Sequence, residues 1–321
     1  MLNTGDALDN LEELEATSNY SEPGEQLKTF FILNPVAGTT DAEQAAELIQ
    51  SACSSRSLDY RIHKTSKGED ISPVVADALS EGYQRFAALG GDGTVAMVAA
   101  CLVGRNIPLG IMPGGSGNVL AKELAIPIDI AASLELLLDS PKIRILDGML
   151  ANGKYYFLNV GAGVSSLTTK NTRREDKRKF GLVAYLWRGL EQIVRYSPRR
   201  FRVIADGEEY RYRASEVMVV NASIMGAPPF KWSPDIEPDD RSLEVCIITA
   251  RKLKEVPRFM LDVLLDRQES SPYINCVPVR KEVYLDVSNP LPVQGDGEII
   301  GTTPVKVAVI PAALHVIVPA S

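Results

Sequence analysis

The stretch that decides the fold is RFAALGGDGTV, residues 85–95. Its apolar run at residues 86–89 predicts a buried strand, and apolar residues at helical spacing begin at Val95. Between them, the glycines let backbone N–H groups approach an anion closely, and the helix start adds unpaired donors and a partial positive charge. A strand, a glycine turn and a helix start in this order predict a phosphate-binding site. The alternative is a sharp connection in which Asp92 bonds its own backbone.

Two polar residues of the turn have chemistry of their own. Thr94 can cap the helix or donate its hydroxyl hydrogen to a phosphate. A bare carboxylate beside a polyphosphate is repulsive, so we expect Asp92 to act through a metal ion or to anchor a neighbouring cation.

Composition narrows the class of protein. The 321 residues suggest two domains, and the 45% hydrophobic content is ordinary for a globular chain. A net charge of −7 argues against a general nucleic-acid binder. No apolar run approaches the roughly 18 residues of a membrane span, and no secretory signal is visible, so we expect a cytoplasmic protein. The acidic, polar residues 1–27 predict a mobile tail.

Cysteines and histidines contribute little to the predicted chemistry. The four cysteines (Cys53, Cys101, Cys246 and Cys276) are far apart and mostly in apolar surroundings. We interpret them as reduced core residues, with zinc or disulfides as the alternative. The two histidines lie in strand-like runs and are expected to be packed, which leaves carboxylates as the default acid–base groups.

From residue 28 to residue 148 the pattern alternates between apolar strands and amphipathic helices. This rhythm predicts an α/β domain with an open parallel sheet and helices on both faces. Ligands of such sheets bind at the carboxyl ends of the strands. Polar or glycine-rich turns fall at four of those ends: residues 34–38, Thr65, residues 90–94 and residues 114–118. They predict a nucleotide site, although neither the Walker nor the Rossmann glycine pattern occurs.

The second half, residues 149–321, has short alternating runs separated by turn residues. These predict an all-β antiparallel sandwich or barrel, with a hairpin turn at Asp206-Gly207. Whether the C-terminal end, roughly the last 15 residues, packs with the first domain is left open. An amphipathic helix is expected at residues 180–196, within a basic region that runs from Arg173 to Arg202. It would contact an anionic membrane surface or pack on the sheet with a solvated rim.

An ordered set of motifs then resembles a known family. The set comprises Asn34-Pro-x-x-Gly, Gly90-Gly-Asp-Gly-Thr, Pro113-x-Gly-Ser-Gly-Asn-Val-Leu-Ala, Asn159-x-Gly-x-Gly, Gln294-Gly-Asp-Gly-Glu and Ile310-Pro-Ala-Ala-Leu. From residue 28 onward the chain resembles the diacylglycerol kinase catalytic-domain family, bacterial lipid kinases related to sphingosine and ceramide kinases. The GGDGT motif alone is shared with NAD kinases, so the ordered set carries the resemblance.

The resemblance implies ATP-dependent phosphorylation of a lipid hydroxyl, most readily of the diacylglycerol type, with Mg²⁺. It implies nucleotide contacts from Asn34, Thr65, Gly90, Gly91, Asp92, Gly93, Thr94, Val95 and Ser116, with support from Asn118. Asp296 matches the proton acceptor, and Glu298 would support it or a metal. A plain hairpin turn is the other interpretation of Asp296-Gly297, and both can hold.

Two departures from the family pattern concern metal binding. The resemblance implies a metal bound by the carbonyl oxygens of Glu237 and Ser242 and the carboxylate of Asp240, but Arg241 stands where the family often has glycine. Val119 stands where many members have aspartate.

The expected partner is a lipid at a membrane surface, contacted peripherally, with no nucleic acid; a homodimer is left open. Two other functions are left open as well. One is a kinase of soluble substrates, like the NAD kinases. The other is a nucleotide- or lipid-sensing protein without turnover.

Overall fold

The computed structural model describes residues 27–36, 42–139, 142–171, 198–226, 229–250 and 254–320. The chain divides into two compact units: Met1–Leu146 with Ala312–Ser321, and Asp147–Pro311. The predicted tail up to residue 26 and the predicted helix at residues 180–196 lie outside the described residues. No helix within the described part is long and apolar enough to cross a membrane.

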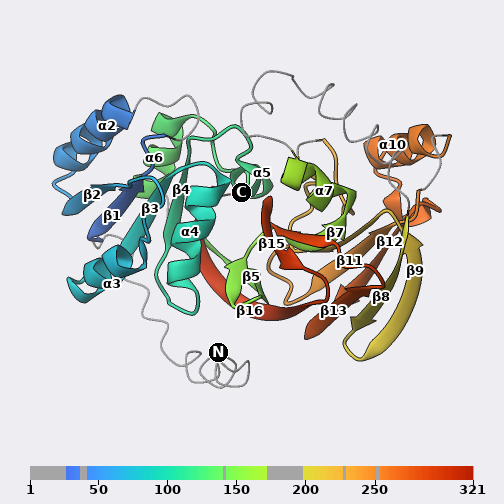
Figure 1. Ribbon diagram of the computed structural model, residues 1–321. Helices are drawn as coiled ribbons and strands as arrows, with labels where there is room; N and C mark the ends of the chain where they lie inside the picture. Colours follow the sequence, from blue (N-terminus) through green and yellow to red (C-terminus); the bar gives the residue numbers. More distant parts are fainter. Residues whose placement is uncertain are drawn as a thin grey trace. The chain divides into compact units, whose positions relative to one another are not determined.

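The first unit is built on a parallel sheet, in the order β2-β1-β3-β4 followed by the C-terminal end of β16 (Figure 1). The strands are β1 (Thr29–Leu33), β2 (Tyr60–Lys64), β3 (Arg85–Gly90), β4 (Leu109–Pro113) and β16 (Val305–Val318). Every residue of β1, β3 and β4 is buried, because helices cover both faces of the sheet. The strand order reverses at β1, because β2 lies on one side of β1 and β3 lies on the other. Ligands of open α/β sheets bind at such a switch point.

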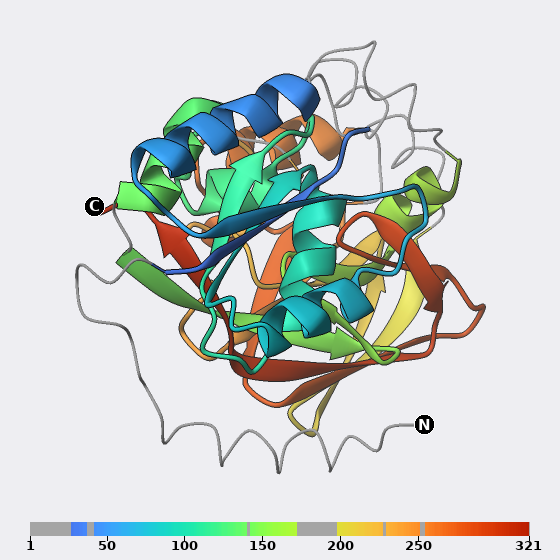
Figure 2. The same ribbon diagram turned by 90° about the vertical axis from the view of Figure 1, so that its left-hand side faces the viewer.

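The helices form two layers around this sheet (Figures 1 and 2). The helices of the unit are α2 (Ala42–Ser55), α3 (Ser72–Ser80), α4 (Asp92–Leu102), the short α5 (Val119–Glu123) and α6 (Ile130–Asp139). Helices α2 and α6 bury Ile49, Leu134 and Leu137 against the side chains of Phe31 and Leu89 on one face. Helices α3 and α4 cover the other face.

The second unit consists mainly of antiparallel strands. One sheet has the order β12-β11-β10-β7-β14-β15, and β16, β13, β8 and β9 pair antiparallel in a second sheet, while β5 pairs with β6. Inward-facing side chains of both sheets, such as Val219, Val245, Val203 and Leu285, share one core, as in a sandwich. The strands are β5 (Lys142–Ala151), β6 (Lys154–Tyr156), β7 (Asn159–Gly163), β8 (Arg199–Ala205), β9 (Glu208–Ala214), β10 (Glu216–Val220), β11 (Leu243–Ile248), β12 (Ile274–Val279), β13 (Glu282–Val287), β14 (Pro292–Gly295) and β15 (Glu298–Thr302). The helices are α7 (Val164–Asn171), α10 (Val256–Leu264) and the short 3₁₀ helix η2 (Gln268–Ser270).

Strand β16 differs from its predicted form. The sequence predicts two strands, at residues 305–310 and 314–318, separated by a proline and small residues. The structure has one strand, in which Ala312 takes a left-handed φ of 50°. Its first part belongs to the second unit, and Ala312–Ser321 belongs to the first.

The prediction that all four cysteines are reduced core residues is wrong for two of them. Cys246 on β11 lies directly opposite Cys276 on β12, with 4.1 Å between their Cα atoms, and the two form a disulfide. Because the two residues are 30 positions apart, only the strand pairing reveals that they are neighbours. Cys53 and Cys101 are free thiols.

Candidate functional site

Three predicted nucleotide contacts meet at the carboxyl ends of the first strands. Asn34 follows β1, and its backbone N–H donates to the carbonyl of Leu89 on β3, at 2.9 Å. The Asn34 side-chain amide donates to the Thr94 hydroxyl, also at 2.9 Å. Thr65, which follows β2, donates its backbone N–H to the Leu33 carbonyl at 2.8 Å. The ends of β2, β1 and β3 are therefore joined into one rim at the switch point.

The glycine turn is shorter than predicted, because α4 begins at Asp92 and not at Val95. Gly91 is the N-cap residue, and its carbonyl accepts the N–H groups of Thr94 and Val95 at 2.9 and 3.1 Å. Thr94 is buried in the first turn and does not cap the helix. The N–H groups of Asp92 and Gly93 have no intrahelical partner, since the carbonyls they would need precede the helix. This end of α4 thus offers donors and a positive partial charge to an anion.

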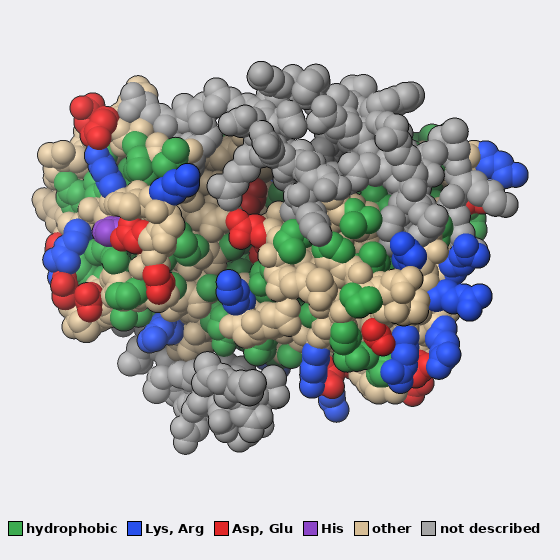
Figure 3. Space-filling view, viewed as in Figure 1, with side chains coloured by type: hydrophobic (Ala, Val, Ile, Leu, Met, Phe, Trp, Pro, Cys, Tyr) green, Lys and Arg blue, Asp and Glu red, His purple; other side chains and the backbone are tan. Residues whose placement is uncertain are grey.

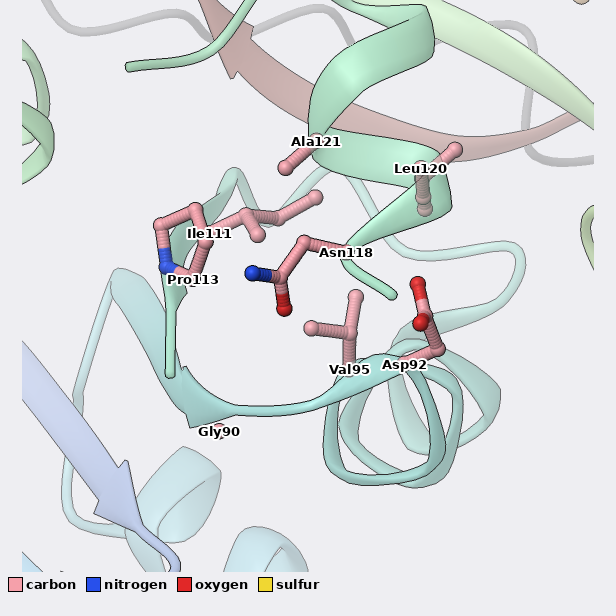
Figure 4. A pocket seen from close by; sticks show the side chains of 8 residues that line it. All are labelled: Gly90, Asp92, Val95, Ile111, Pro113, Asn118, Leu120 and Ala121. Carbon is pink, nitrogen blue, oxygen red and sulfur yellow. The ribbon is translucent and has the colours of Figure 1, made fainter. Parts of the chain in front are cut away.

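A second loop, residues 113–118, folds back onto this helix start. The Gly114 N–H donates to the Gly90 carbonyl at 2.8 Å. The Asn118 side chain closes the loop from within, since it accepts the Gly115 N–H at 3.0 Å and donates to the Gly115 carbonyl at 2.9 Å. Asn118 itself has a left-handed φ of 50°. In Figure 4 its amide lies between Pro113 and the turn of α4 that carries Val95.

Asp92 anchors this second loop. Its carboxylate accepts the N–H of Val119, the first residue of α5, at 2.6 Å. The partner is therefore a backbone N–H group, where the sequence predicts a metal ion or a cation. The backbone of Val119 makes this contact, so the replacement of the family's aspartate side chain leaves it intact.

The rim encloses little space of its own. A hollow lined by Gly90, Asp92, Val95 and Asn118, among others, has no enclosed room even for a water molecule (Figure 4). Ligand pockets commonly hold at least about 300 Å³. The hollow is therefore too small for a ligand, whereas Gly93 and Ser116 are exposed on the rim around it.

The close approach of the two loops explains why residue 115 is glycine, and it yields a prediction. A Cβ at Gly115 would lie 2.5 Å from the Gly91 Cα, whereas a Cβ at Gly91 would meet the Gly115 Cα at an ordinary 3.4 Å. We expect Gly115→Ala to destabilise the protein by about 1–3 kcal/mol, because backbone atoms must shift to relieve the overlap. Thermal unfolding should show a lower Tm for Gly115→Ala and a near-normal Tm for Gly91→Ala. Equal melting temperatures would contradict the close packing of the loops.

In the second unit, Asp296 lies on a hairpin and is held by backbone groups. Asp296 and Gly297 connect β14 to β15 with φ values of 47° and 85°, as a tight hairpin turn requires. The carboxylate accepts the N–H groups of Phe157, Leu158 and Asn159 at 2.9, 3.0 and 2.9 Å. The hairpin interpretation is confirmed, and the half-buried carboxylate is fixed in one orientation by three donors.

The segment that supplies these donors is fixed on its other sides. The Asn221 side chain, 1% exposed, donates to the Phe157 carbonyl at 3.2 Å, and the Asn221 N–H donates to the Leu158 carbonyl at 3.0 Å. Gln294 donates its side-chain amide to the Asn159 side-chain oxygen at 2.6 Å and accepts the Gly297 N–H at 2.9 Å. The side-chain amides of Asn221 and Gln294 therefore position the backbone segment that donates to Asp296.

The same arrangement occurs a second time in this unit. Asp206, in the predicted Asp206-Gly207 hairpin, has a φ of 48°. Its carboxylate accepts the N–H groups of Arg280, Lys281 and Glu282 at 2.8, 2.9 and 3.0 Å. Burial alone would raise the pKa of Asp206, but the three donors outweigh it and lower that pKa. An aspartate that accepts three backbone N–H groups in this way thus has a structural role by itself. An experiment on Asp296 must distinguish a catalytic role from this structural one.

Two other titratable side chains, Glu298 and Tyr156, lie near the Asp296 turn. Glu298 is exposed at the start of β15. Burial, with the charges of Asp296 and Glu298, raises the pKa of Tyr156 to about 12, so the phenol stays protonated at neutral pH. The Tyr156 ring packs where a side chain at Gly295 would lie.

The predicted metal segment forms a turn without a cluster of carboxylates. Asp240 accepts the N–H of Ser242 at 2.9 Å, while the exposed Glu237 precedes it. Arg241 takes a left-handed φ of 63°, which glycine would adopt more readily, and donates its N–H to Asp147 at 2.6 Å. Among the described residues, no three His, Cys, Asp or Glu side chains converge on a metal site. A metal here would rely on carbonyl oxygens, and this site stays a prediction.

Buried Glu216 anchors α7 and makes stability depend on pH. Its carboxylate accepts the N–H and hydroxyl of Ser165, in the first turn of α7, at 2.7 and 2.9 Å. Burial raises the pKa of Glu216 from 4.5 to about 7, against the effect of the Ser165 donors. The folded state thus holds this proton more tightly than the unfolded state. The resulting stability is fully present below about pH 4.5 and is lost as the pH rises through about 7.

We therefore expect Glu216→Gln to flatten the stability profile between pH 5 and 7. Wild type should lose up to about 3 kcal/mol more than the variant over this range. Denaturant unfolding at each pH measures the difference. Glu244, whose pKa burial and the Asp240 charge also raise to about 7, is the same in both proteins and cancels. Parallel profiles would contradict the assignment to Glu216.

Within the first unit the structure brings the predicted rim residues together, and within the second unit it places Asp296 and Glu298 on one hairpin. Sequence reasoning assigned no role to Asn159, Gln294, Asn221 or Glu216. Asn159 and Gln294 stand within quoted motifs, which was a usable signal. Asn221 and Glu216 lie in ordinary strand patterns, and only the folded chain reveals them.

Comparisons with known proteins agree with the α/β and β-sandwich folds of the two units. Residues 28–147 match the diacylglycerol kinase catalytic domain, and residues 159–318 match the YegS C-terminal NAD kinase beta sandwich-like domain. A Pseudomonas aeruginosa protein described as a probable YegS-like lipid kinase is 30% identical over 270 residues, covering 83% of this chain and 86% of that protein. An uncharacterized Synechocystis protein is 26% identical over 302 residues, covering 90% and 69%. A crystal structure of a diacylglycerol kinase from Bacillus anthracis has the same fold, with a TM-score of 0.77, 23% identity, and coverage of 93% and 99%.

These matches identify a kinase-type phosphotransferase with an α/β unit and a β-sandwich unit. The chain belongs to the YegS-like lipid kinase family, whose first domain is of the diacylglycerol kinase type. Membership in this family implies a nucleotide as phosphate donor.

Proposed function

We propose that this chain transfers the γ-phosphate of ATP to the hydroxyl of a diacylglycerol-type lipid, with Mg²⁺ bound to the nucleotide. The observation that carries the nucleotide site is Gly93. It is exposed in the first turn of α4, its backbone is helical, and no atom of the described residues packs within 4 Å of where a Cβ would be. The fold does not require glycine there, and alanine would form the helix more readily. A phosphate that approaches the backbone more closely than a side chain allows explains the glycine.

The proposed reaction uses Asp296 as proton acceptor. The lipid hydroxyl oxygen bonds to the γ-phosphorus, the bond from that phosphorus to the bridging oxygen of ADP breaks, and the hydroxyl proton passes to the carboxylate. Phosphoryl transfer proceeds through a loose transition state. The orientation of the Asp296 carboxylate, which accepts the proton, therefore contributes more than a strong basicity of that carboxylate. Three backbone donors and the two amides behind them supply that orientation.

The residues present fit a magnesium ion carried by the nucleotide. Mg²⁺ usually keeps several waters and binds through one or two carboxylates together with substrate phosphates. One carboxylate oxygen of Asp92 accepts the Val119 N–H, so only its other oxygen would serve in that limited role, and the described residues form no all-protein cage. When bound, the ion would neutralise charge on the transferring phosphate.

The test is transfer of labelled γ-phosphate from ATP to vesicles that hold diacylglycerol, a sphingosine-like lipid or phosphatidylglycerol, and in parallel to NAD without vesicles. We expect labelled phosphatidic acid from diacylglycerol. Label in NAD alone would make the chain a soluble-substrate kinase. ATP binding without any labelled product would make it a sensor without turnover.

A further inference from the structure

The outer face of the β8–β9 hairpin carries four arginines in two directly opposed pairs. The strand register places Arg200 opposite Arg213 and Arg202 opposite Arg211. All four side chains are exposed, whereas the alternate residues of β8 are buried in the core. Figure 3 shows Lys and Arg side chains gathered at the lower right, where Figure 1 has β8 and β9.

This arrangement costs stability within the hairpin. Like charges directly opposite each other on a sheet are destabilising. Glu209 offsets the repulsion in one pair, since its carboxylate contacts Arg202 at 2.8 Å and Arg211 at 2.7 Å. Among the described residues, Arg200 and Arg213 form no ion pair. The Arg200–Arg213 pair therefore breaks the rule against opposed like charges without an ion pair to offset it. Such departures from local rules are expected at functional positions.

The chemistry of the face points to phosphate groups spread over a plane. Guanidinium groups bind phosphate oxygens through two parallel hydrogen bonds. The chain as a whole has a net charge of −7, so this positive face is a local concentration and gives the second unit a preferred side for an anionic surface. A long nucleic acid would extend beyond the hairpin onto an acidic molecule. A membrane instead offers many phosphates in one plane.

We propose that the outer face of the β8–β9 hairpin docks on anionic phospholipid headgroups. The inference rests on the proposed function in that a lipid substrate lies in such a membrane. The face includes Arg200 and Arg202, from the end of the basic region for which membrane contact was one of two open interpretations. It adds Arg211 and Arg213, which only the strand pairing brings beside them.

The test compares two double variants with the same change in charge. Arg200→Gln/Arg213→Gln removes an opposed pair, and Arg105→Gln/Lys154→Gln removes two exposed cations elsewhere. Co-sedimentation is measured without nucleotide, on phosphatidylcholine vesicles with and without phosphatidylglycerol. Loss of the opposed pair should weaken binding to the anionic vesicles about 30-fold, since each basic side chain near such a surface contributes about 1 kcal/mol. Its Tm should equal or exceed that of wild type, because a repulsive pair is gone.

Unchanged binding by Arg200→Gln/Arg213→Gln, or an equal loss in the control, would overturn the proposal. So would tighter binding of wild type to a duplex oligonucleotide than to the vesicles. Transfer to a short-chain diacylglycerol in detergent is assayed separately. Intact docking without transfer would contradict the proposed kinase activity and leave the docking face standing, whereas intact transfer without docking would contradict the docking face alone.

Discussion

Gly93→Ala is expected to weaken ATP binding by about tenfold or more while leaving the protein equally stable or up to about 1 kcal/mol more stable. The methyl group enters open space in the first turn of α4, so it meets no atom in the part of the chain that the structure describes. It also favours the helix, because alanine loses less conformational freedom than glycine. The only expected loss is the room in which a phosphate oxygen would meet the backbone. Isothermal titration with ATP and thermal unfolding measure the two effects on the same preparation.

The choice of ligand supplies the control for this variant. Adenosine lacks phosphates, so any weak binding of adenosine should be similar in wild type and Gly93→Ala. A higher Tm combined with unchanged ATP affinity would show that no phosphate lies against Gly93. Lower affinity for ATP and adenosine alike would indicate a general disturbance of the rim.

Asp296→Asn is expected to reduce phosphoryl transfer by about 10²- to 10⁴-fold, the usual contribution of a positioned acid–base group. The amide keeps the shape of the side chain but accepts no proton. Its NH₂ group must also face at least one of the three backbone donors, which costs about 1–3 kcal/mol of stability. Steady-state transfer to diacylglycerol vesicles, with ATP affinity measured alongside, should show a loss of kcat at near-normal ATP binding.

Asp206→Asn is the matched control, because Asp206 accepts three consecutive backbone N–H groups in the same pattern. Both variants should lose comparable stability, and only Asp296→Asn should lose transfer. If the two variants lose stability and activity in parallel, Asp296 has the structural role alone. Full activity in Asp296→Asn would remove it from the reaction.

The sequence sufficed to predict the features that depend on local patterns. Buried apolar runs followed by polar turns predicted the parallel sheet and its rim, and Asp-Gly pairs predicted both hairpins. The start of α4 was misplaced because Gly91, Asp92 and Gly93 are weak helix formers. Tertiary contacts, including the bond from Asp92 to the Val119 N–H, accompany a helix that propensity alone does not predict.

Features that depend on strand pairing could not be predicted. The donors to Asp296 come from Phe157, Leu158 and Asn159, more than 130 residues earlier, because β14 pairs with β7. The Cys246–Cys276 disulfide depends in the same way on the register of β11 and β12. Sequence spacing carries no information about which distant strands become neighbours.

Amide hydrogen exchange over residues 91–95 tests the central claim most directly, because the claim is that backbone N–H groups at the start of α4 hold the phosphates of the nucleotide. The measurement compares the protein saturated with ATP, the protein with adenosine, and the protein alone. The account predicts that ATP slows exchange at Asp92 and Gly93, whose N–H groups lack intrahelical partners, and that adenosine leaves it unchanged. Unaltered exchange at these two amides under saturating ATP, or equal protection by adenosine, would contradict it.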